Sequence, residues 1–142
     1  MPRPENGIDP ISRHFGFRWE APNSIRLTIR PDLINAGGLL SGVVAYALVD
    51  YCMGSTLWTQ RNEGERIATI NISINYVQTA TEGDIVCTSE LDRRNDRIGV
   101  MRSEVRHSDG RLLVTAVGSF SIFPEERTAH LRAPTPDEQP GV

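Results

Sequence analysis

Hydrophobic and polar positions divide most of the chain into one long apolar segment and the alternating runs that follow it. The segment 41–58 is apolar almost all the way round, which predicts a helix buried on most sides. The run 67–77 alternates between apolar and polar positions, as a half-buried strand does. The strand face expected to cover the helix carries Ala68, Ile70, Ile72, Ile74 and Tyr76.

Three further runs, 84–91, 97–107 and 111–123, also read as strands. Turns at 93–96 and 108–110 separate them, and such short connections favour antiparallel pairing. Upstream, the segment 15–29 predicts a strand pair or one bent strand around a turn. A single sheet buries one long helix only by curling round it, so the pattern predicts an α+β fold with a curved antiparallel sheet.

The length of 142 residues suits one domain, expected over residues 14–123. The segment 1–13 contains proline and glycine, and we interpret it as an N-terminal arm with at most one helical turn. The segment 124–142 is rich in proline, glutamate and threonine and predicts a flexible C-terminal tail.

Composition narrows the classes of partner. The net charge of −3 argues against nucleic acid, which usually requires a basic face. The two cysteines lack metal-ligand spacing, so no metal is expected, and with no apolar leader they favour a reducing, cytoplasmic setting. A membrane span at 39–57 has nearly the required length, but Asp50 near its centre and the absence of flanking basic residues argue against it.

Asp50 is the most informative residue, because it lies inside the predicted buried helix. A buried aspartate is either paired structurally, including at a subunit contact, or used as a nucleophile or general base in a dry cleft. Both alternatives remain open from the residues alone.

The entrance to this helix is rich in glycine. Ser41 is a plausible N-cap, and the free N–H of Gly42 at the positive end of the helix dipole would bind an oxyanion. An ordinary glycine-rich helix start is the alternative. Gly42 and Asp50 are separated by about 12 Å of helix, so if both act on one carbonyl they come from two subunits.

The stretch Asn35-x-x-Gly38-x-x-Ser41-Gly42, with Asp50 nine residues after Ser41, resembles the hot-dog-fold acyl-CoA thioesterases of the phenylacetate-pathway (PaaI-like) type. The likeness extends over residues 35–122, including the strand 69–76 and the later turns. It implies a hot-dog fold: a curved antiparallel sheet wrapped around a central helix.

The resemblance also implies an activity, the hydrolysis of an acyl-CoA or aryl-CoA thioester to free acid and CoA. Asp50 would be the nucleophile or the base that activates water, and the partner's Gly42 amide would hold the oxyanion. Asn35 would position the water or the thioester, and Thr69 would hydrogen-bond Asp50. Strand alternation places Thr69 on the face away from the helix, so the family role requires either a bulge at the strand start or a subunit contact there.

Two positions depart from the family pattern. Ser41 stands where the family has histidine, and Val43 stands where it has a second glycine. A serine donates a hydrogen bond but carries no charge, so the departures bear on activity more than on fold.

Coenzyme A enters as part of the substrate rather than as a cofactor. Arg93, Arg94 and Arg97 are candidates to bind its phosphates, because arginine binds phosphate in bidentate fashion. A solvated turn is the alternative.

The competing functions are a non-catalytic acyl-CoA-binding or regulatory module, a hydratase or dehydratase, and a structural oligomer. The hydratase reading is weakened because neither the helix nor its entrance contains the histidine that such chemistry normally uses. Thioester hydrolysis by a homodimer or homotetramer (a dimer of dimers) explains more of these sequence features than the other functions do. The sequence does not identify the acyl group.

Overall fold

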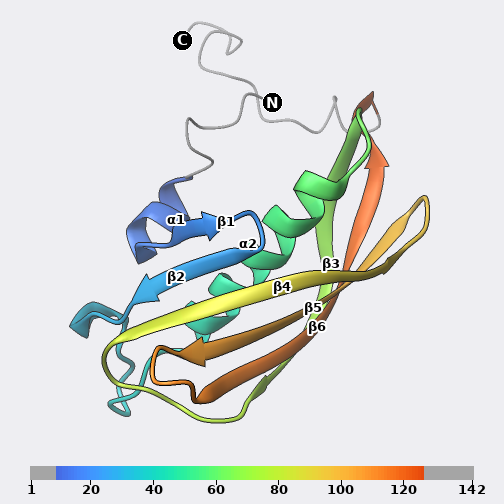
Figure 1. The fold of residues 1–142 in the computed structure, drawn as a ribbon. Coiled ribbons are helices and arrows are strands. Elements are labelled where there is room, and N and C mark those ends of the chain that lie inside the picture. Colours follow the sequence, from blue (N-terminus) through green and yellow to red (C-terminus); the bar gives the residue numbers. More distant parts are fainter. Residues whose placement is uncertain (1–8, 127–142) are drawn as a thin grey trace, which may run out of the picture.

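The computed structural model describes residues 9–126 and shows a six-stranded antiparallel sheet curved around one long helix (Figure 1). The strand order is β1-β2-β4-β5-β6-β3. The elements are α1 (Pro10–Phe15), β1 (Arg18–Ala21), β2 (Ser24–Thr28), the 3₁₀ turn η2 (Pro31–Leu33), α2 (Gly42–Gln60), β3 (Glu65–Tyr76), β4 (Asp84–Arg94), β5 (Ile98–His107) and β6 (Leu112–Pro124). The predicted α+β hot-dog architecture is confirmed.

Helix α1 begins at Pro10, inside the segment expected to be an arm with at most one helical turn. Asp9 caps it by accepting from the Ser12 N–H at 2.8 Å. The other Asp9 oxygen accepts a 2.7 Å hydrogen bond from the Tyr51 hydroxyl of α2, which ties α1 to the central helix. Most of the predicted arm and tail, residues 1–8 and 127–142, lies outside the described residues.

Helix α2 begins where its sequence provides a cap, since the Ser41 side chain accepts from the Val43 N–H at 3.3 Å. Its buried residues face the sheet: Val44, Ala45, Leu48, Val49, Cys52, Met53, Thr56 and Leu57. Within residues 9–126, no helix is long and apolar enough to cross a membrane.

The expectation that α2 is buried almost all round is wrong for one stripe. Val43 remains 72% exposed and Tyr46 37% exposed. Asp50 is only partly buried and follows them at helical spacing, so the three side chains share one face. The buried residues of α2 pack against the sheet, whereas this face is left open.

Strand β3 contains a bulge that changes which of its side chains face the helix. Thr69 is opposite Phe120 and Asn71 is opposite Ser119, so Ile70 is the extra residue. Residues before the bulge therefore change face relative to a regular strand. Thr69 lies on the helix side, where its hydroxyl reaches Asp50 of α2. Ala68 and Ile70, which were expected on that side, point away from the helix.

Strand β4 is longer than the alternation predicts. Arg93 and Arg94, expected in the turn, belong to the strand and are opposite Val100 and Gly99 of β5. The turn follows them, and the side-chain oxygen of Asn95 accepts the backbone N–H groups at its far end.

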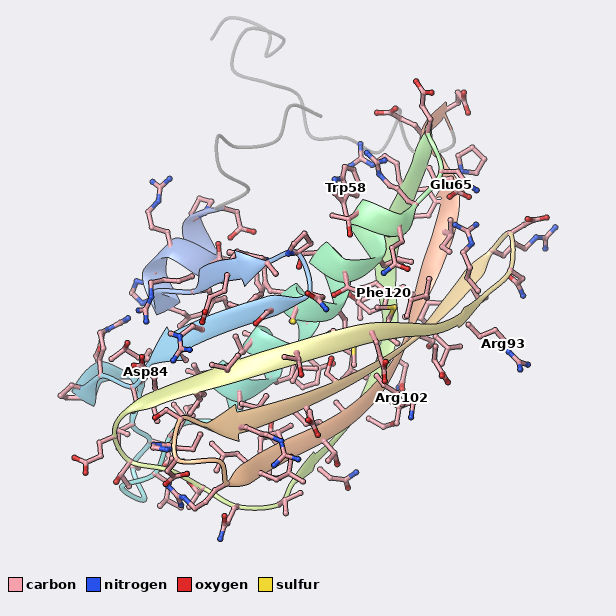
Figure 2. All side chains as sticks on the ribbon, in the orientation of Figure 1. Trp58, Glu65, Asp84, Arg93, Arg102 and Phe120 are labelled. Carbon is pink, nitrogen blue, oxygen red and sulfur yellow. The ribbon has the colours of Figure 1, made fainter. Side chains whose placement is uncertain are left out.

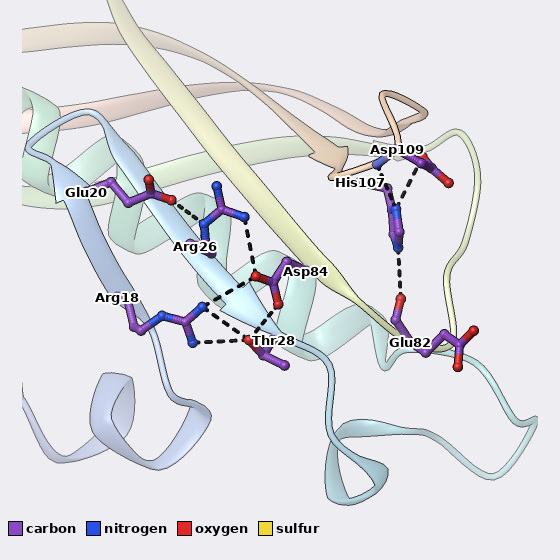
Figure 3. A network of polar contacts seen from close by, with 8 residues as sticks. All are labelled: Arg18, Glu20, Arg26, Thr28, Glu82, Asp84, His107 and Asp109. Atoms are coloured by element: carbon purple, nitrogen blue, oxygen red, sulfur yellow. Dashed lines mark hydrogen bonds and ion pairs between the residues drawn. The ribbon is translucent and has the colours of Figure 1, made fainter.

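Two polar clusters fix the beginning of β4 and the loop before it (Figure 3). Asp84 accepts the Thr28 hydroxyl at 2.6 Å and pairs with Arg26 at 3.3 Å, which joins β2 to β4. A ring nitrogen of His107 lies 2.8 Å from the Glu82 carbonyl oxygen. These contacts fix the end of the loop between β3 and β4 against β2 and β5. The Leu40 N–H donates to the Ala80 carbonyl at 3.1 Å and joins the same loop to the segment before α2.

Candidate functional site

Asp50 lies in the middle of α2, with its carboxylate directed toward β3. The Thr69 hydroxyl donates to Asp50 Oδ1 at 2.7 Å. Across residues 9–126, the Asp50 carboxylate forms no second hydrogen bond. A carboxylate that is oriented by one donor and still accessible retains lone pairs for a water or a substrate carbon.

The Asp50 pocket, a recess of about 390 Å³ between α2, β3 and the N-terminal segment, contains this carboxylate. It combines aromatic rings with polar groups. Its lining consists of Asp9, Trp19, Asp50, Tyr51, Gly54, Ser55, Trp58, Ile67, Ala68, Thr69 and Phe120. The Trp19 indole N–H donates to the Ser55 hydroxyl at 3.0 Å, which fixes that wall.

Tyr51 and Asp9 form a second polar pair in this pocket. Burial alone would raise the pKa of Asp9, but hydrogen bonds from the Ser12 backbone N–H and the Tyr51 hydroxyl outweigh it and lower the pKa. Burial, followed by the bond to Asp9, raises the pKa of Tyr51 far above its ordinary value. The pair is therefore a carboxylate accepting from a neutral phenol at neutral pH.

The start of α2 presents a free donor. The N–H of Val43 is capped by Ser41 and the N–H of Val44 donates to the Ser41 carbonyl, whereas in the described part of the chain the Gly42 N–H has no acceptor. The Tyr76 hydroxyl donates to the Gly42 carbonyl at 2.6 Å, and its oxygen and two ring carbons lie 3.2–3.4 Å from where a Gly42 Cβ would stand. The first turn is thus anchored while one N–H remains open.

Asn35 lies in the loop that leads into α2. Its side-chain oxygen accepts the N–H groups of Gly37 at 2.9 Å and Leu39 at 3.2 Å, so the side chain shapes this loop. Asn35 and Gly42 both line a pocket at the start of α2, here called the helix-start pocket. Asp50 does not line it.

The predicted site residues therefore fall into two groups within one chain. Asp50 and Thr69 are together in the Asp50 pocket, and Asn35, Ser41 and Gly42 are together at the start of α2. About 12 Å of helix separates Gly42 from Asp50, too far for both to contact one carbonyl carbon.

The arginines expected to meet CoA phosphates have different surroundings. Arg94 forms two hydrogen bonds with Glu65, at 2.8 and 2.9 Å, so its guanidinium is already engaged. Arg93 and Arg97 are exposed, and Figure 2 shows Arg93 projecting outward at the β4–β5 end. Among residues 9–126, no cluster of histidine, cysteine, aspartate or glutamate could hold a metal ion.

Comparison with known protein families identifies the family to which this chain belongs. Residues 37–114, more than half of the chain, match the thioesterase superfamily. The chain belongs to the thioesterase superfamily. The matched region of this superfamily member contains Gly42, Asp50 and Thr69.

Solved structures agree on the fold. Conserved protein PA5202 from Pseudomonas aeruginosa is 25% identical with a TM-score of 0.77, covering 86% of this chain and all of that one. BH2602 from Bacillus halodurans, solved with CoA, is 18% identical with a TM-score of 0.78 over 84% of this chain and 79% of that one. Thioesterase HI1161 from Haemophilus influenzae is 15% identical with a TM-score of 0.75 over 85% and 87%. No curated protein matches the sequence significantly.

Several residues at the two pockets were not predicted from the sequence. Tyr76 was assigned to the core, yet it is half exposed and anchors Gly42. Trp19 and Tyr51 line the Asp50 pocket, and no local sequence pattern identifies either of them as a pocket residue. Asp9 carried a usable signal, since an aspartate before Pro10 is typical of a helix start.

Proposed function

We propose that this member of the thioesterase superfamily hydrolyses acyl-CoA or aryl-CoA thioesters, with Asp50 as the catalytic carboxylate. The observation that carries the proposal is the 2.7 Å bond from Thr69 to Asp50 at the wall of an open pocket. A structural aspartate satisfied in the core would need neither the pocket nor partial exposure. The CoA in the BH2602 structure supports CoA as the leaving part of the substrate.

The chemistry requires a carboxylate and an oxyanion donor on opposite sides of one carbonyl. Asp50 either removes a proton from water as the water oxygen attacks the carbonyl carbon, or attacks that carbon itself to form an anhydride that water then opens. In both routes the carbon–sulfur bond breaks, CoA leaves as the thiolate, and one water is consumed. A preorganised N–H such as that of Gly42 stabilises the oxyanion by about 3–4 kcal/mol.

We propose that a second copy of the chain completes the site. Val43 and Tyr46 leave an apolar stripe on the Asp50 face of α2, and the neighbouring Tyr76 and Val77 are 53% and 55% exposed. Strand β3 is at the edge of the sheet, and no other strand of residues 9–126 pairs with its outer backbone groups. A two-fold partner pairing along this edge would bring its Gly42 toward Asp50 and create two sites per dimer.

The proposal also assigns arginines to the phosphates of CoA. Arg93 and Arg97 are exposed at one hairpin and remain our candidates for the phosphates of CoA. Arg94 is the weakest of the three arginines, because its guanidinium binds Glu65.

The test is release of free thiol from short, aromatic and longer acyl-CoAs by the wild type, Asp50→Asn and Asp50→Ala. Asp92→Asn is the matched control, because Asp92 is an exposed carboxylate that binds Arg102. We expect turnover to fall at least a hundredfold in both Asp50 variants, as for loss of a general base, and to be retained in the control. Full activity in Asp50→Asn, with unchanged folding, would refute the catalytic role.

One observation favours a second candidate function, a non-catalytic acyl-CoA-binding protein. Ser41 replaces the family histidine, and its hydroxyl oxygen is engaged in capping Val43. If no thioester is turned over but acyl-CoAs raise the melting temperature, the binding function replaces hydrolysis.

A further inference from the structure

The helix-start pocket has a volume of about 420 Å³ and lies between the first turns of α2, the loop after β3 and the inner face of the sheet. Its inner wall is made of buried aliphatic side chains. They are Ala45, Ile85, Val105, Leu113 and Val114. No charged side chain of the described residues lines this pocket.

Two polar residues connect this pocket to the proposed chemistry. Gly42, with its free N–H, and Asn35 line it together with the aliphatic wall. A thioester carbonyl oxygen held by the Gly42 N–H would place the carbonyl carbon beside the pocket. One substituent of that carbon then enters the apolar space, and the other, the sulfur of CoA, points away from it.

We infer that the helix-start pocket binds the acyl group of the substrate as an aliphatic chain of medium length. This inference rests on the proposed thioester hydrolysis and names its substrate class. Its volume of about 420 Å³ lies toward the lower end of the range of roughly 300–1,000 Å³ typical of small-ligand sites. The rise of rate with chain length should therefore stop at a medium length, before the longest chains.

The Asp50 pocket suits an aliphatic chain less well. It contains two carboxylates, those of Asp9 and Asp50, and the hydroxyl groups of Tyr51, Ser55 and Thr69. An alkyl chain placed there would desolvate these groups without replacing their contacts with water. In this arrangement the Asp50 carboxylate, or the water that it activates, attacks the thioester carbonyl carbon from the side of the Asp50 pocket.

Burial of each methylene gives an expected magnitude. About 0.8 kcal/mol per methylene corresponds to about a fourfold increase in kcat/KM for each added carbon until the pocket is full. Ala45→Leu extends a side chain from α2 into this space and displaces about three carbons of substrate. We therefore expect it to reduce kcat/KM for octanoyl-CoA at least tenfold while acetyl-CoA hydrolysis changes less than threefold.

Three variants make the assignment specific. Val105→Ala enlarges the pocket and should move the optimum to longer chains. Ala21→Leu makes the same chemical change as Ala45→Leu at a residue that lines neither pocket, and should leave the chain-length profile unchanged. Trp19→Leu alters the Asp50 pocket and should not change the preference among saturated chains.

The experiment measures kcat/KM from acetyl- to dodecanoyl-CoA and, in parallel, the affinity of non-hydrolysable S-alkyl-CoA thioethers of the same lengths. A profile that is unchanged in both Ala45→Leu and Val105→Ala, or that shifts in Trp19→Leu, overturns the inference. If the wild type hydrolyses no thioester, the proposed function fails, and the thioether affinities test the pocket separately: a chain-length dependence that Ala45→Leu shortens supports it, and its absence overturns it.

Discussion

Replacing Thr69 by valine tests the Asp50 site by removing one hydroxyl from a side chain of nearly the same shape. The lost interaction is the 2.7 Å hydrogen bond to Asp50 Oδ1. Bonds to charged groups contribute about 1.5–3 kcal/mol, and water will replace part of this one because Thr69 is exposed. A loss of about 1–2 kcal/mol of transition-state stabilisation predicts a five- to thirtyfold decrease in kcat.

The assay is steady-state thiol release by Thr69→Val and Thr69→Ser at saturating acyl-CoA. Serine retains the hydroxyl, so we expect it to recover most of the activity, while KM changes little in either variant. The melting temperature should change by only a few degrees, because the site is open to water. These readouts separate a positioning role from a general loss of folding.

A double-mutant cycle then links Thr69 to Asp50. If the hydroxyl acts through the carboxylate, Thr69→Val has no further effect once Asp50→Asn is present, so the double variant is as slow as Asp50→Asn alone. An additive effect, or a Thr69→Val enzyme with the wild-type kcat, would refute the reasoning.

Three further perturbations have defined outcomes. Hydrogen bonding to Arg94 lowers the pKa of Glu65 from 4.5 to about 2. The ion pair therefore stabilises the fold fully above pH 4.5, and this stabilisation is lost as the pH falls toward 2. Urea unfolding of Glu65→Gln should show a loss of about 1 kcal/mol in the free energy of unfolding at pH 7, and a smaller loss in acid. Gly118→Ala would place a Cβ 2.8 Å from the Met53 sulfur, so chemical denaturation should reveal a loss of about 1–3 kcal/mol. Tyr76→Phe removes the anchor of the first turn of α2 and should lower kcat severalfold with a smaller change in KM; equal kcat values would contradict that role.

The fold was predictable because its elements have strong local patterns. The apolar run with Ser41 before it predicted α2, and four alternating runs with short turns predicted most of the antiparallel sheet. The spacing of Asp50 from Gly42 also predicted that one chain cannot place both on one carbonyl. Each of these inferences uses information contained within one segment.

The remaining features depend on contacts between segments. The bulge at Ile70 has no local sequence signal, yet it determines that Thr69 faces Asp50. Alternation assumes a regular strand and therefore assigned Ala68 to the wrong face. Likewise, the ion pair of Arg94 with Glu65 joins the end of β4 to the start of β3. The sheet separates these strands by β5 and β6, so the contact exists only in the folded chain.

The central claim, that Asp50 of one subunit acts with Gly42 of another, is tested most directly by subunit complementation. Gly42→Pro removes the free N–H at a position where proline suits the first turn of a helix, and Ser41 already has a backbone compatible with a following proline. Its Cβ would lie 3.2–3.4 Å from Tyr76, so that side chain must shift by a few tenths of an ångström. Asp50→Asn removes the carboxylate. Each variant alone should be nearly inactive, whereas differently tagged copies produced together should form mixed dimers with one intact site.

The measurement is thiol release by the purified mixed dimer. One intact site of two predicts about half of the wild-type rate per dimer, far above either parent. A mixed dimer that forms but is as inactive as its parents would contradict the account.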